Sequence, residues 1–353
     1  MSRWQLVKLN FERNPVHFGD LGIGMEESGE RTYSDTLFSA WVSSYARLFG
    51  KATVEQLFAQ FPKNEDQHSL SSATLEPPFR LSSTFVYANE TYYLPRPIAP
   101  PQGYPTEDLA FAKEYKKLNY LPLKIWQRWY QGEGFTAPDQ HELELKVNQS
   151  KTSGELEEVH TFDYSKTFKS QRIPKVSLDR TTRASNFYHV GFVQFQPEAG
   201  LYFLIHFSND EPPLETELKA ALDFLGEEGI GGERSSGAGR FTATWHDLDE
   251  IWSAVVNFQQ SNFYSLMSLL WEHPFDPEYL QGARYALRER GGWIVSPVSG
   301  QQARRQNVQM FIEGSIFRQA IGGVLANVTP EKFKAHSIYR SGISLSLPIY
   351  LAS

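Results

Sequence analysis

A glycine-rich stretch at residues 226–241, GEEGIGGERSSGAGRF, carries residue types that suit phosphate binding. It contains six glycines, two arginines and two serines. Glycine allows a ligand to come close to the backbone amides, and arginine and serine side chains donate hydrogen bonds to phosphate oxygens. We therefore predict that an extended polyanion contacts Gly229, Gly231, Gly232, Arg234, Ser235, Ser236, Gly237, Gly239 and Arg240.

The surroundings of this stretch exclude the best-known phosphate loops. Residues 214–226 predict a helix and residues 240–245 a strand, whereas Walker A and dinucleotide-binding loops lead from a strand into a helix. No lysine follows these glycines, and no G-x-S-x-G motif is present. The alternative interpretation is a long helix cap that leads into a hairpin, although one glycine is enough to end a helix.

A basic and aromatic run at 113–129, KEYKKLNYLPLKIWQRW, is a second candidate for binding nucleic acid. Basic side chains neutralise phosphates, and aromatic faces stack on unpaired bases. We predict phosphate contacts for Lys113, Lys116 and Lys117. The alternative is a solvated helix face whose aromatic side chains, such as Tyr115 and Trp126, lie in the core.

Catalytic and metal-binding motifs are missing from the sequence. The nine histidines are widely spaced and form no H-E-x-x-H motif, so we predict no metal, no cofactor and no catalytic residues. His17 is interpreted as a structural hydrogen-bonding residue. Asp35 is interpreted as a cap or a first-turn charge of a helix, with an RNA contact as the alternative. Surface positions are expected for His336, Tyr339 and Arg340.

The composition indicates a globular protein. Of its 353 residues, 41% are hydrophobic, and no apolar run is long enough to span a bilayer. There is no cysteine, which together with the polar N-terminus predicts a cytoplasmic protein. The formal net charge of −7 argues against a free-standing nucleic-acid binder but leaves local basic patches open.

The predicted elements suit an α+β fold. Strands are expected at 3–12, 176–195, 200–207 and 240–245, a hairpin at 79–94, and helices at 33–50 and 214–226. This order fits a βαββαβ ferredoxin-like (RRM-like) sheet in residues 1–248, with a protruding insertion near 137–175. Residues 249–353 predict a second ferredoxin-like or otherwise β-rich domain.

Several motifs resemble a known family. The glycine stretch is similar to the glycine-rich loop of RAMP proteins of CRISPR systems. HFGDLGIGMEESGERTYSDTLFSAW (17–41), LPRP (94–97) and VSLDRTTRASNFYHVGFVQF (176–195) occur in the order typical of the fourth Csm subunit of type III-A effector complexes. One departure is Tyr33, where many members of that family have histidine.

The resemblance implies a non-catalytic RNA-binding subunit for antiviral defence. It would hold the repeat-derived 5′ tag of a crRNA and connect the large polymerase-like Csm subunit with a backbone subunit, away from any membrane. Arg180 and Arg183, just after the thumb-like insertion, would grip the RNA backbone, with Arg172 and Lys175 extending their patch. The alternative is a metal-independent crRNA-processing endoribonuclease with His17 as its general base.

Overall fold

The centre of the molecule is an antiparallel sheet whose two middle strands are buried on both faces. The computed structural model describes residues 2–19, 24–64, 75–105, 114–148, 150–179, 181, 184–294 and 303–352. Strand β1 (Arg3–Asn10) lies between β8 (Ala199–Phe207) and β9 (Thr242–Asp247). Because side chains alternate along a strand, Val7 enters one hydrophobic core and Leu6 the other.

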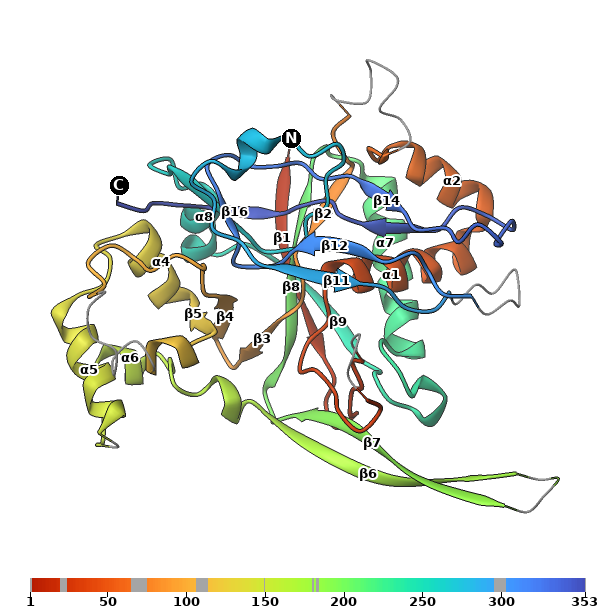
Figure 1. Cartoon of the computed structure of the whole chain (residues 1–353), viewed down its shortest axis with the longest axis horizontal. Coiled ribbons are helices and arrows are strands. Elements are labelled where there is room, and N and C mark those ends of the chain that lie inside the picture. The colour runs from red at the N-terminus through yellow and green to blue at the C-terminus, as the bar shows by residue number, and fades with distance from the viewer. Residues whose placement is uncertain are drawn as a thin grey trace.

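Two long helices cover one face of this sheet (Figure 1). They are α1 (Ser34–Phe49) and α7 (Pro212–Glu228), which pack against each other. Strands β2 (Phe79–Leu81) and β3 (Phe85–Ala88) both pair with β8. The resulting order β3–β8–β1–β9, with α1 and α7 as crossovers, is the order that a βαββαβ chain produces.

The second half of the chain covers the other face. Its strands β10 (Phe263–Leu266) and β16 (Ser346–Ile349) share a core with Leu6, Phe85 and Leu204 of the central sheet. The two halves predicted as separate domains are therefore joined by a common hydrophobic core.

Helices and hairpins surround these layers. Strands β4 (Thr91–Pro95) and β5 (Tyr120–Pro122) extend the central sheet beyond β3. Further helices are α2 (Lys51–Ala59), α4 (Leu123–Gln131), α5 (Ala137–Val147), α6 (Glu155–Glu158) and α8 (Glu250–Val256), with single turns η3 (Tyr164–Lys166), η4 (Arg234–Ser236) and η5 (Pro277–Leu280). The short pairs are β11 (Leu287–Arg290) with β12 (Val308–Phe311) and β14 (Leu325–Asn327) with β15 (Tyr339–Ser341), and β13 (Ile316–Phe317) pairs with β10.

A long hairpin extends away from the body of the molecule (Figure 1). It consists of β6 (Phe168–Leu178) and β7 (Ser185–Phe195), paired in register over their full length. The predicted insertion near 137–175 is therefore placed too early, since helices α5 and α6 occupy its first part. The predicted strand 176–195 is also corrected, because β6 ends at Leu178 and β7 begins at Ser185.

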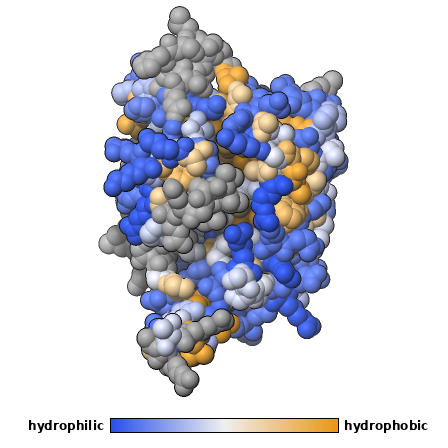
Figure 2. All heavy atoms as spheres, turned by 90° about the vertical axis from the view of Figure 1, so that its right-hand side faces the viewer, coloured by the Kyte–Doolittle hydropathy of each residue, from blue (hydrophilic) through white to orange (hydrophobic). Residues whose placement is uncertain are grey.

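The α+β fold class predicted from the sequence is confirmed. The described residues 249–294 and 303–352 contain one α-helix, α8, and short strands. These described residues therefore lack the two crossover helices of a second ferredoxin-like unit. Of the two alternatives predicted for this half, they agree only with a β-rich domain. No helix in the described part of the chain is long and apolar enough to cross a membrane. Polar side chains predominate on the face drawn in Figure 2, with smaller apolar groups between them.

Candidate nucleic-acid interface

A cavity of about 1330 Å³ lies between the two halves of the chain. Its walls are the loop after β1, one side of α1, the glycine stretch, β11 and the segment after β11. Nine arginines are among the described residues that line it, against three acidic residues, Glu30, Glu228 and Glu313; the arginines are Arg31, Arg47, Arg96, Arg234, Arg288, Arg290, Arg304, Arg305 and Arg340. In a chain of net charge −7, this concentration of positive charge makes the cavity a candidate site for a polyanion.

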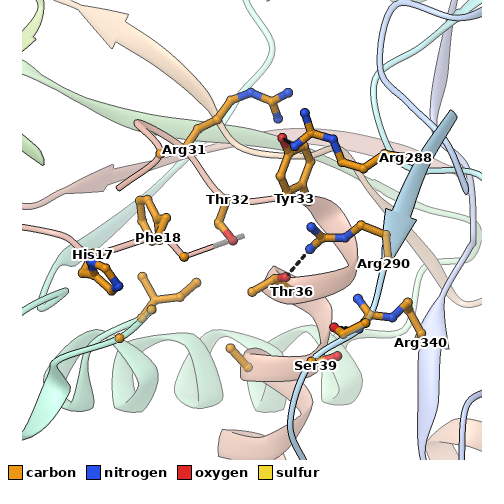
Figure 3. A pocket seen from close by; sticks show the side chains of 18 of the residues that line it. His17, Phe18, Arg31, Thr32, Tyr33, Thr36, Ser39, Arg288, Arg290 and Arg340 are labelled. Carbon is orange, nitrogen blue, oxygen red and sulfur yellow. Dashed lines mark hydrogen bonds between the residues drawn. The ribbon is translucent and has the colours of Figure 1, made fainter. Parts of the chain in front are cut away.

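Tyr33, the residue directly before α1, is surrounded by guanidinium groups. The ring centroid lies 4.7 Å from Cζ of Arg31, 4.8 Å from that of Arg288 and 4.6 Å from that of Arg290. Arg288 also donates a hydrogen bond to the Tyr33 hydroxyl. Figure 3 shows these side chains converging from the loop and from β11. The aromatic ring thus holds three positive charges close together at the cavity wall.

Arg31 is fixed by a buried ion pair that crosses between the halves. Its Nη1 and Nη2 donate to the two carboxylate oxygens of Glu313 at 3.3 and 3.2 Å, and its Nε donates to the Tyr120 hydroxyl at 2.6 Å. Burial opposes the charge on Arg31, but Glu313, Tyr120 and Tyr33 together outweigh burial and raise the Arg31 pKa well above its usual value. Arg31 is therefore a positioned cation and not a mobile one.

Asp35 makes the second buried connection between the halves. Arg290 donates to it through Nε at 3.0 Å and Nη2 at 3.1 Å, and Arg340 donates through Nη1. Burial by itself would raise the pKa of Asp35, but the two guanidiniums outweigh it and lower the pKa to about 2. Asp35 lies in the first turn of α1, as predicted. Neither Asp35 nor Ser34 caps this helix, because its N-cap is Tyr33. Arg340, expected at the surface, is buried.

Small polar side chains of α1 form the cavity floor between these arginines and the glycine stretch. Thr36, Ser39 and Ser43 follow one another along one side of the helix and lead to Arg47. Ser39 and Ser43 donate their hydroxyl protons to carbonyl oxygens four residues earlier, at 2.8 and 2.7 Å. Their short side chains leave the space above the helix open (Figure 3).

The glycine stretch forms the opposite wall, and the structure corrects the reason for its composition. The amides of Gly229, Gly232, Gly237 and Gly239, four of the five glycines predicted to face phosphate, donate to carbonyl oxygens of the chain itself. A Cβ atom on Gly231, where φ is +93°, would lie 2.5 Å from the His17 carbonyl oxygen. These glycines therefore allow tight packing against the protein's own backbone.

The polar residues of the stretch divide into those at the cavity and those away from it. Arg234 is exposed and lines both the main cavity and an adjoining hollow of about 670 Å³, which Ser235 and Arg240 also line. Ser236 accepts a hydrogen bond from Lys175 of β6. Lys175 also pairs with Glu233, so the β6–β7 hairpin is tied to the glycine stretch near the far end of β6.

His17 connects the glycine stretch with β7. Its Nδ1 donates to the Gly191 carbonyl oxygen at 2.7 Å, and the buried ring packs beside Gly232. In the neutral ring, Nε2 then carries the lone pair. The predicted structural hydrogen bond is present, and the same tautomer leaves Nε2 as the nitrogen able to accept a proton.

The other predicted residues lie away from the cavity or outside the described residues. Lys116 and Lys117 are exposed and do not line it, while Tyr115 and Trp126 are buried, which is the division that the alternative interpretation of the run 113–129 describes. His336 packs on Phe333 and Tyr339 on Phe58. Lys113, Arg180 and Arg183 lie outside the described residues.

The sequence interpretation missed most of the arginines that the cavity gathers. Arg288, Arg290, Arg304 and Arg305 come from two segments, LRER and ARR, whose pairs of arginines were the available signal. A metal site is not formed by the described residues, in which no three His, Asp or Glu side chains come together.

The chain is similar to known proteins over nearly its whole length. Residues 259–349 match the family model of the CRISPR Csm4 C-terminal domain. The CRISPR system Cms protein Csm4 of Thermococcus onnurineus (strain NA1) is 25% identical over 328 residues, covering 90% of this chain and 91% of that protein. Its counterpart from Mycobacterium tuberculosis (strain ATCC 25618 / H37Rv) is 27% identical over 353 residues, covering 99% and 97%.

Solved structures share the fold. A chain in the crystal structure of the Csm3–Csm4 subcomplex of a type III-A CRISPR–Cas interference complex matches with a TM-score of 0.62 and 20% identity, over 98% of this chain and 99% of that one. A chain of the Csm1–Csm4 cassette in complex with cA4 matches with a TM-score of 0.56 and 19% identity, over the full length of both. The chain thus has the same α+β fold as these two chains. Residues 259–349 match the Csm4 C-terminal domain, and the chain as a whole is similar to Csm4 proteins, which is the resemblance that the motifs of its sequence predicted.

Proposed function

We propose that this chain is a non-catalytic subunit that binds the repeat-derived 5′ tag of crRNA in the cavity between its halves. The observation that carries the proposal is the gathering of nine arginines around one cavity in an acidic chain. A single RNA strand offers one phosphate per nucleotide, and arginine is well suited to bind phosphate through several N–H groups. The ring of Tyr33 and the floor of α1 leave room for a strand beside these cations.

We further infer that the chain connects the large polymerase-like subunit with a backbone subunit. Similar chains occur in a Csm3–Csm4 subcomplex and in a Csm1–Csm4 cassette, which supports contacts with both kinds of neighbour. The acidic net charge fits a surface that meets proteins over much of its area and RNA at one cavity.

The test is the affinity of the assembled complex for tag RNA. In Arg288→Ala the cavity loses one cation beside Tyr33, and we expect weaker binding with a smaller salt dependence. Arg318→Ala is the matched control, since Arg318 is an exposed arginine of the same half that stacks on Phe263 outside the cavity. Equal affinity of the wild type and of Arg288→Ala at every salt concentration would contradict the proposal, as would a complex without this chain that protects the tag normally.

The second candidate, an RNA-processing endoribonuclease, is kept because of one observation. The hydrogen bond of His17 Nδ1 to Gly191 leaves Nε2 as the proton acceptor at the cavity wall. Against this function, the His17 ring is buried and packed on Gly232. Such a position suits a structural residue that connects the glycine stretch with the β6–β7 hairpin. Incubation with repeat RNA in the absence of metal separates the two functions.

A further inference from the structure

One carboxylate at the start of α1 faces three guanidinium groups. Asp35 accepts hydrogen bonds from Arg290 and Arg340, and Arg305 lies within electrostatic range of all three residues. Three guanidiniums and one carboxylate leave an excess of two positive charges in a partly buried place. Such an excess is costly unless an anion compensates it.

Arg305 is the member of this cluster without a counter-ion. Its Nε is buried and has no hydrogen-bond partner, and no ion pair is found for its guanidinium among the described residues. Burial and repulsion by Arg340 lower its pKa to about 10. The backbone is held in place, because the Arg305 amide donates to the Gly292 carbonyl oxygen at 2.9 Å. Arg305 is therefore a cation at the cavity wall whose backbone is held in place.

Arg340 offers a second unused donor at the same place. It is 2% exposed, and its Nη1 and Nη2 are engaged by Asp35 and by the Gly291 carbonyl oxygen, but its Nε has no partner. Both Arg305 and Arg340 line the cavity. A tetrahedral anion with several acceptor oxygens matches two arginines with unused donors better than a single carboxylate does.

We propose that Arg305 and Arg340 together bind one phosphate group at the wall of the cavity that the second half provides. This inference deepens the proposed function, in which the phosphate is a phosphodiester of the RNA strand. A terminal phosphate of an RNA or a nucleotide has the same chemistry, and the experiments below separate the two sources.

The first experiment needs no RNA. Thermal unfolding of the full chain is followed in chloride and in inorganic phosphate at equal ionic strength. We expect phosphate to raise the unfolding temperature of the wild type by binding the native state. In Arg305→Met this response is lost, and the unfolding temperature in chloride equals or exceeds that of the wild type, because an uncompensated charge has been removed.

A matched control comes from an arginine of the same half that lies outside the cavity. Arg318 is exposed and stacks on Phe263, so Arg318→Met removes the same charge without touching the cluster and should keep the phosphate response. The response of Arg305→Met is the decisive result. If phosphate stabilises Arg305→Met as much as the wild type, or stabilises neither, the proposed site does not exist, whatever the stability of the variant in chloride.

The second experiment identifies the source of the phosphate. The assembled complex is titrated with one oligoribonucleotide in two forms, with a 5′-hydroxyl and with a 5′-phosphate. For an internal phosphodiester, Arg305→Met weakens both forms by about 10- to 100-fold, as expected for a charge-assisted contact, and lowers the salt slope by about 0.7. If only the 5′-phosphorylated form is weakened, the site binds a terminal phosphate.

Failure of this inference is distinguishable from failure of the proposed function. If the wild-type complex does not bind tag RNA although the chain still shows the phosphate response, the proposed function is refuted and the phosphate site is retained. Normal binding of tag RNA without a phosphate response refutes the site and keeps the function.

Discussion

Replacing Asp35 by asparagine tests the buried connection between the two halves. The substitution keeps the shape of the side chain but removes the charge that compensates Arg290 and Arg340. Asp35 is fully buried, and Arg290 reaches both of its oxygens. Two buried guanidiniums would then lack their carboxylate, so we expect a large loss of stability.

The expected size follows from the pKa of Asp35. Burial alone would raise this pKa, yet the two arginines lower it from 3.8 to about 2. At about 1.36 kcal/mol per pKa unit, this shift corresponds to about 2.5 kcal/mol of stability at neutral pH. Breaking a buried ion pair by removing one partner costs about 3–5 kcal/mol. We therefore expect Asp35→Asn to lower the free energy of unfolding by about 2.5–5 kcal/mol.

The same shift predicts a pH dependence with a definite sign. A carboxyl group whose pKa is lower in the native than in the unfolded state stabilises the native state above the unfolded-state pKa, and this contribution is lost as the pH falls. The stability difference between the wild type and Asp35→Asn should thus be full at neutral pH and shrink as the pH falls from about 5 towards 2.

Chemical denaturation over a pH series measures both effects. Asp210→Asn is the control, since Asp210 is an exposed aspartate for which no hydrogen bond or ion pair is found among the described residues. It should match the wild type within about 0.5 kcal/mol. The reasoning is refuted if Asp35→Asn is as stable as Asp210→Asn at neutral pH, or if the stability difference stays constant down to pH 2.

Three further outcomes are expected. Arg234→Ala should weaken the binding of tag RNA for all sequences and lower the salt slope by about one unit; an unchanged slope in a salt series would remove Arg234 from the interface. Gly231→Val should disturb the packing on the His17 carbonyl oxygen, where φ is +93°, so the RNA affinity should fall and not recover at low salt; full recovery would contradict this. The isolated chain should not cleave repeat RNA without metal, and cleavage that disappears in His17→Ala would instead establish the endoribonuclease.

Local patterns in the sequence were sufficient for the elements around the glycine stretch. The alternation in residues 3–12 and the helical spacing in 33–50 and 214–226 correspond to β1, α1 and α7. Within the hairpin expected at 79–94, β3 and β4 pair with each other on either side of Asn89–Glu90. These features depend on neighbours within a few residues, which is why periodicity and turn chemistry reveal them. The family motifs are equally local and identified the relatives.

Composition was less informative about why a residue is needed. The glycine-rich stretch lies at the cavity, as predicted, and Arg234 faces it. However, most of the glycine amides bond within the chain: those of Gly229 and Gly237 donate to nearby carbonyl oxygens, and those of Gly232 and Gly239 donate to His17 and Pro15, more than two hundred residues earlier. A glycine that must approach a ligand and one that must approach its own backbone look the same in a sequence.

The arginine cluster was decided only by the tertiary structure. Arg290 and Arg340 lie 255 and 305 residues beyond Asp35, and they reach it because the second half packs on the central sheet through a shared core. No periodicity extends over such distances, and each arginine by itself reads as a surface residue. The sequence determined most of the helices and strands of the first half and which known proteins the chain resembles. The packing of the two halves determined which charges meet, because burial and charge pairing depend on distances in space and not on spacing along the chain.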